Sequence, residues 1–215
     1  MVSAFKTFSR AVALAAFTAL PALVGDPVQA ATVQTIDVGP QTGTYTSNVR
    51  GFWFTAPTDF WITGIDVPTD ASTANFNAVV LRLTDVPPLW SNSTTDYDLL
   101  YRAVDQATAV TGLSIAIKAG DIIGVLGNRG NVNSYGASPY TTSILGESVT
   151  LTRFGTQTPI TEAAFPGADV WTENGGSISR VNLTVTDVAP VPVPASIPLL
   201  LTGLGVLTVL RRRRS

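Results

Sequence analysis

The chain of 215 residues contains no cysteine and no histidine. Without cysteine there is no disulfide framework, and without both residue types the usual zinc and copper ligand sets are excluded. The same two absences exclude Ser-His-Asp and Cys-His catalysis. Carboxylates are the only acid–base groups that remain plausible, so we expect a protein that is not an enzyme and holds no resident cofactor.

Positive charge is scarce in the middle of the chain. Six of the 13 basic residues lie in the two terminal segments, which leaves seven basic residues against 14 acidic residues between positions 31 and 187. A region with this excess of negative charge repels phosphate backbones. Nucleic acid is therefore not an expected partner.

Residues 1–30 have the three parts of a secretory signal peptide. Lys6 and Arg10 form a positive segment, residues 11–24 are small and apolar, and Val28-Gln29-Ala30 supplies the small residues of a cleavage site. We expect signal peptidase to cleave after Ala30 or one residue later. Residues 31–187 are then the exported domain.

Residues 188–215 combine a proline-rich linker, an apolar segment and a basic tail. The linker, residues 188–196, ends in the motif Val191, Pro192, Val193, Pro194, Ala195 and Ser196. Residues 197–210 are apolar or small, and a helix over them covers about 21 Å, which predicts a short transmembrane helix. The tail, residues 211–215, contains Arg211, Arg212, Arg213 and Arg214. These arginines orient the helix with the tail in the cytoplasm and the domain outside.

The order of these three elements resembles the PEP-CTERM class of sorting signals, and more closely its VPLPA-type variant. Val193 stands where the commoner pattern has Glu. The resemblance implies that an exosortase-type transpeptidase in the membrane recognises the motif and cuts near it, in Gram-negative bacteria that make exopolysaccharide. It implies an inner-membrane intermediate and then a place at the cell surface or outside the cell. A plain single-pass anchor without processing is the alternative.

The exported domain is punctuated by Gly, Pro, Asn, Asp and Thr, with β-branched runs between them. Alternating apolar and polar residues at 79–84, 113–118 and 181–186 indicate antiparallel sheets packed on one side. Further strands are expected at 32–38, 51–55, 61–67, 99–104, 122–127 and 148–154. Residues 118–121 are expected to join two strands as a tight hairpin. This pattern predicts an all-β, jelly-roll-like antiparallel β-sandwich.

Aromatic and amide side chains are the candidate ligand contacts. Trp53 alternates with Phe52 and Phe54, so it is expected on the opposite face of its strand, toward solvent or a second layer. Residues 127–140 read as a long polar loop that carries the other candidates, Asn131, Asn133, Tyr135 and Tyr140. Such side chains suit sugar hydroxyls, which makes exopolysaccharide the candidate ligand. The plain alternatives are tryptophans that pack the core and a flexible connection.

Acidic residues occur close together at Asp96 and Asp98, and at Asp66 and Asp70. Their simplest interpretation is exposed turn residues, and calcium binding is the functional alternative. A carboxylate-dependent polysaccharide-active enzyme would need two acids facing each other in a cleft. The sequence favours an exported, non-enzymatic surface or extracellular-matrix protein over that enzyme and over a membrane-anchored binding domain.

Overall fold

The computed structural model describes residues 30–190. The predicted signal peptide before Ala30, the sorting motif, the apolar helix and the arginine tail lie outside these residues. Among residues 30–190, no helix is long and apolar enough to cross a membrane. The described part of the chain forms antiparallel β-sheets, as the sequence predicts, with one short 3-10 helix, η1 (Phe165–Gly167).

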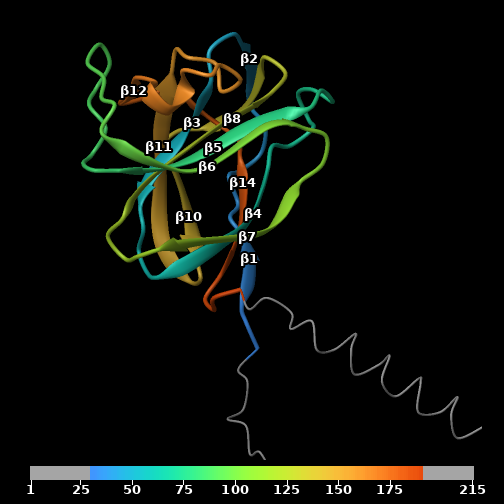
Figure 1. Ribbon diagram of the computed structural model, residues 1–215, viewed down its shortest axis with the longest axis vertical. Helices are drawn as coiled ribbons and strands as arrows, with labels where there is room; N and C mark the ends of the chain where they lie inside the picture. The colour runs from blue at the N-terminus through green and yellow to red at the C-terminus, as the bar shows by residue number, and fades with distance from the viewer. Residues whose placement is uncertain (1–29, 191–215) are drawn as a thin grey trace, which may run out of the picture. The chain divides into compact units, whose positions relative to one another are not determined.

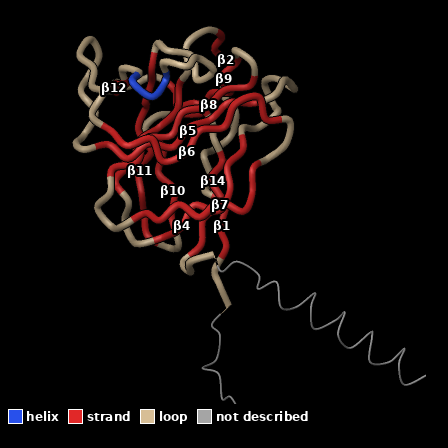
Figure 2. Tube along the Cα trace, in the orientation of Figure 1, coloured by secondary structure: helices blue, strands red, loops and turns tan. Residues whose placement is uncertain are grey.

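Two sheets make up the domain (Figure 1, Figure 2). The first has four strands, in the order β1 (Val33–Thr35), β14 (Asn182–Thr186), β4 (Phe60–Asp66) and β7 (Val110–Ile117). The second has a main path of β10 (Tyr140–Ile144), β11 (Glu147–Thr156), β3 (Arg50–Thr55), β8 (Ile122–Arg129), β5 (Phe76–Leu83) and β6 (Tyr97–Gln106). Off this path, β12 (Val170–Thr172) pairs with β11 and β9 (Val132–Ala137) pairs with β8, while β2 (Gly43–Thr46) and β13 (Ser177–Ser179) pair with β9.

The main hydrophobic core contains side chains from both sheets. Phe52 and Phe54 of β3 belong to it, together with Leu183 and Val185 of β14. All four are at most 1% exposed. The alternation at Val181, Leu183 and Val185 therefore places one face of β14 in the core, as the sequence predicts.

A second core covers the other face of the larger sheet. Val79, Leu81 and Leu83 of β5 point into it, whereas Val80 points into the main core. The segment between β11 and β12 covers this face and includes Phe165, which is fully buried. The prediction of packing on one side only is wrong for β5, because this connecting segment supplies a second apolar layer.

The predicted hairpin at Lys118–Asp121 is wrong. β7 pairs with β4 in the smaller sheet, whereas β8 pairs with β3 and β5 in the larger one. The turn itself exists, because the Asp121 amide donates to the Lys118 carbonyl over 2.9 Å. It carries the chain from one sheet to the other instead of pairing its flanking strands.

The predicted loop at residues 127–140 is also wrong. It contains the end of β8, a two-residue turn at Gly130 and Asn131, and the whole of β9. Gly130 has a positive φ of 59°, the backbone conformation that glycine adopts readily. Asn133 and Ser134 of β9 are buried although they are polar, which explains why the segment resembles a loop in sequence.

The two ends of the described domain lie next to each other. β1 and β14 are antiparallel neighbours, with Val33 opposite Thr186. The Thr32 amide donates to Asp187 Oδ1 over 2.9 Å. β2 and β12 lie at the other end of the domain in Figure 1. The chain therefore enters and leaves the domain at the end away from β2 and β12.

Candidate functional site

Aromatic rings and guanidinium groups pack together in one cluster near β2, β9 and β12. Tyr45 comes from β2, Tyr135 from β9 and Trp171 from β12, while Arg50 begins β3 and Arg153 lies in β11. Trp90, in the connection between β5 and β6, completes the cluster. We call these side chains the arginine–aromatic ladder: Trp90, Trp171, Arg50, Tyr45, Tyr135 and Arg153.

Each member of the ladder contacts the next. The Trp90 and Trp171 ring centroids are 5.0 Å apart. Arg50 Cζ lies 4.7 Å from the Trp171 ring centroid and 5.3 Å from that of Tyr45. Tyr45 stacks on Tyr135 at 5.7 Å with an interplanar angle of 3°, and Arg153 Cζ lies 5.5 Å from the Tyr135 ring. Each cation–π contact contributes about 0.5–2 kcal/mol, more where water is excluded.

Backbone groups hold Arg50 in place. Its Nη1 donates to the carbonyls of Val49 and Thr156 over 3.0 and 2.9 Å. Its amide donates to Asn133 Oδ1 over 2.9 Å, and Asn133 Nδ2 donates to the carbonyls of Tyr45 and Asn48. Asn133 therefore ties β9 to β3 and to the end of β2, and its side-chain amide is used inside the protein.

Glu173 and Thr172 position Arg153. Arg153 Nε lies 2.5 Å from Glu173 Oε2, in an ion pair that lacks hydrogen-bond alignment. Its Nη1 donates to the Ser177 carbonyl over 2.6 Å. Thr172 Oγ1 donates to the Arg153 carbonyl and accepts a hydrogen bond from Trp53 Nε1 over 2.8 Å.

Four buried polar atoms of the ladder have no hydrogen-bond partner. They are Arg50 Nε, Tyr135 Oη, Arg153 Nε and Trp171 Nε1, and among the described residues they are the complete set of such side-chain atoms. Native proteins pair most of their buried polar groups, so a gathering of exceptions in one place calls for an explanation. Burial lowers the pKa of Arg50 and raises the pKa of Tyr135.

The structure brings together only some of the candidate residues. Trp53 packs against the second core, on the face opposite Phe52 and Phe54 as predicted, and contacts the ladder through Thr172. Tyr135 is a ladder member, and Asn133 hydrogen-bonds the backbone of two other members, Arg50 and Tyr45. Asn131 lies in the turn, where its carbonyl accepts from the Ser47 amide. Tyr140 belongs elsewhere, because its hydroxyl donates to Asp37 Oδ2 over 3.1 Å.

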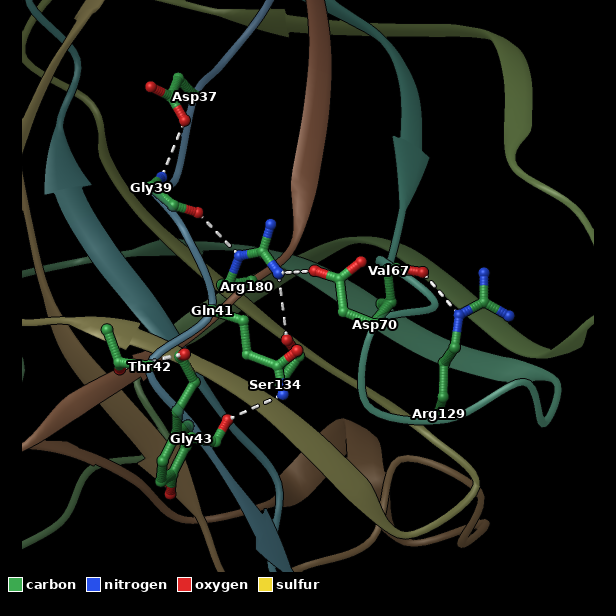
Figure 3. A network of polar contacts seen from close by, with 11 residues as sticks. Asp37, Gly39, Gln41, Thr42, Gly43, Val67, Asp70, Arg129, Ser134 and Arg180 are labelled. Atoms are coloured by element: carbon green, nitrogen blue, oxygen red, sulfur yellow. Dashed lines mark hydrogen bonds and ion pairs between the residues drawn. The ribbon is translucent and has the colours of Figure 1, made fainter.

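Two of the candidate calcium ligands are engaged by arginines. Arg180 pairs with Asp70 and also donates to the Gly39 carbonyl and to Ser134 Oγ (Figure 3). Arg129 Nη2 pairs with Asp66 Oδ1 over 3.1 Å. Asp98 is exposed on β6, and the Asp96 amide donates to Thr94 Oγ1. Within residues 30–190 no three acidic residues gather as a metal site would require.

Most of the ladder is not predicted from the sequence. Arg50 is a basic residue in a strand that is otherwise largely apolar, and that contrast is the signal that points to it. Arg153 lies in a strand of mixed polar and apolar residues. Tyr45 and Glu173 carry no comparable signal. No protein family model, no curated protein and no solved structure matches this chain.

Proposed function

We propose that this chain is an exported, non-enzymatic surface or extracellular-matrix protein whose jelly-roll-like β-sandwich contacts exopolysaccharide. A signal peptide delivers it across the inner membrane, and an exosortase-type transpeptidase processes it at the motif from Val191 to Ser196. The observation that carries the binding part of this proposal is the arginine–aromatic ladder. It combines stacked rings with buried polar atoms that form no hydrogen bond inside the protein.

The connections between strands support the jelly-roll-like assignment. The chain passes from the smaller sheet to the larger one between β1 and β2, between β4 and β5, and between β7 and β8. It returns between β3 and β4, between β6 and β7, and between β13 and β14. Repeated crossing between two packed antiparallel sheets is typical of a jelly roll.

The placement of the chain ends supports a surface role. Thr32 and Asp187 lie together, whereas β2 and β12 lie at the other end of the domain. A domain held at a membrane through either end of its chain therefore presents the ladder away from that membrane. This is the orientation that contact with an extracellular polymer requires.

Cell fractionation tests this function. We would express the chain with and without residues 191–215 in an exosortase-bearing host that makes exopolysaccharide, and assay each fraction for the protein. We expect the full-length chain to appear at the surface or in the polymer fraction, and the shortened chain to lose this location. A full-length protein that stays in the cytoplasm, or one that does not co-sediment with the exopolysaccharide, refutes the proposal.

A further inference from the structure

Arg50 carries a buried positive charge without a negative partner. It is 6% exposed, and among the described residues no carboxylate forms an ion pair with it. The faces of Tyr45 and Trp171 only partly replace the water that it loses. A buried charge is costly unless it is paired, so this site favours the arrival of an anion.

The ladder is a locally positive place in an acidic domain. Arg50 and Arg153 together face a single carboxylate, that of Glu173. Glu173 is held close to Arg153 Nε but without hydrogen-bond alignment, and its side chain is 34% exposed. The Glu173 carboxylate therefore occupies a position from which an incoming carboxylate can displace it toward solvent.

The residues around these charges suit a sugar ring. Tyr45 and Tyr135 are half-buried and parallel, and Trp90 is 51% exposed at the far end of the ladder. Aromatic faces pack against the C–H faces of sugars, while a guanidinium group matches the geometry of a carboxylate. A sugar that bears a carboxylate satisfies both features at once.

We propose that the arginine–aromatic ladder binds a carboxylated sugar, a uronate unit of an acidic polysaccharide. Arg153 binds the carboxylate directly, Arg50 stabilises it through its unpaired charge, and the sugar ring packs against the partly exposed aromatic side chains of the ladder. Glu173 leaves Arg153 when the ligand arrives. This inference rests on the proposed function and names the chemical class of polymer that the domain contacts.

Two forms of one polymer test the inference on the full-length protein purified in detergent. Polygalacturonate carries a carboxylate on each sugar, and its carboxyl-reduced form has the same linkages without the charge. We expect binding to polygalacturonate to be tighter by about tenfold or more, the value of one charged hydrogen bond. Equal binding of both forms overturns the uronate inference and leaves the proposed function standing. A protein that binds neither form nor the exopolysaccharide of its host overturns both.

Two variants with the same change in net charge sharpen the test. Glu173→Gln removes the carboxylate that competes for Arg153, so binding to polygalacturonate should strengthen severalfold. Asp70→Asn removes the partner of Arg180 in the network of Figure 3, outside the ladder, and should leave binding unchanged. If both variants strengthen binding equally, only the general repulsion by the acidic domain has been reduced, and the inference is wrong.

Arg153→Gln should have the opposite effect on binding to polygalacturonate. It removes the guanidinium that binds the carboxylate and should weaken binding to polygalacturonate about tenfold, with little effect on the carboxyl-reduced polymer. Thermal melting identifies a variant that has lost its fold. In that case the comparison of the two polymers with the unaltered protein still decides the matter.

Discussion

Gly51 determines how closely β3 approaches β8. A Cβ atom added at this position would lie 1.8 Å from the Val125 carbonyl oxygen, a backbone atom that cannot move aside without disturbing the sheet. Gly51 directly follows Arg50, so the close approach also positions this member of the ladder. Position 51 therefore requires glycine because glycine has no side chain. Its φ is not the reason, since it lies outside the left-handed region.

Gly51→Ala should lower the free energy of unfolding by about 3 kcal/mol or more, because the backbone of β8 must shift. Gly43→Ala is the matched control, since a Cβ there meets nothing within 4 Å. We expect the control to change stability by about 0.5 kcal/mol or less. Denaturant unfolding of both variants measures the difference, and two similar midpoints would show that β3 and β8 are not packed this closely.

Asp59, directly before β4, holds the turn at residues 118–121 that carries the chain between the two sheets. Its carboxylate accepts from Lys118 Nζ and from the Ala119 amide, each over 2.8 Å. Those hydrogen bonds, that of Lys118 first, lower the pKa of Asp59 below its ordinary value of 3.8. A group whose pKa is lower in the folded state stabilises the protein above its unfolded pKa. That stability is lost as the pH falls through the folded value.

Asp59→Asn should therefore flatten the dependence of unfolding free energy on pH below about pH 4 and weaken the protein near neutral pH. Glu147→Gln is a suitable control, because Glu147 forms no ion pair among the described residues. Thermal melting between pH 2.5 and 7 gives both profiles. An unchanged slope in Asp59→Asn would mean that the turn is not held by this carboxylate.

At the scale of strands, the sequence predicts faces better than partners. Alternation alone places Phe52 and Phe54 in one core and Trp53 on the other face, because side chains along a strand point to opposite sides. The turn at residues 118–121 is wrongly predicted as a hairpin because its residues are the same whether the two flanking strands pair with each other or enter different sheets. Pairing is decided by distant strands, which no local pattern reveals.

Buried polar residues explain why the loop at residues 127–140 was wrongly predicted and why the ladder was not predicted. Asn133 looks like a loop residue, yet its amide links three segments inside the domain. The ladder is missed for a related reason, because its members come from five strands and one connection that meet only in the folded protein. Tyr135 was a candidate for its chemistry, whereas Arg50 and Arg153 have roles that depend on neighbours far away in the sequence.

At the scale of the whole molecule, two features bear on where the domain is held. The described domain has its chain ends together at one end and the ladder near the other. The terminal segments, whose assignments come from sequence alone, predict export followed by processing at both ends. Together they lead us to propose a domain that is held at the membrane only until the sorting motif is cut.

The intact mass of the protein recovered outside the cell tests this central claim most directly. The account predicts a chain that begins at Ala31 or Thr32 and lacks the four arginines from Arg211 to Arg214. A mass that includes these arginines contradicts processing near the motif and supports a plain membrane anchor.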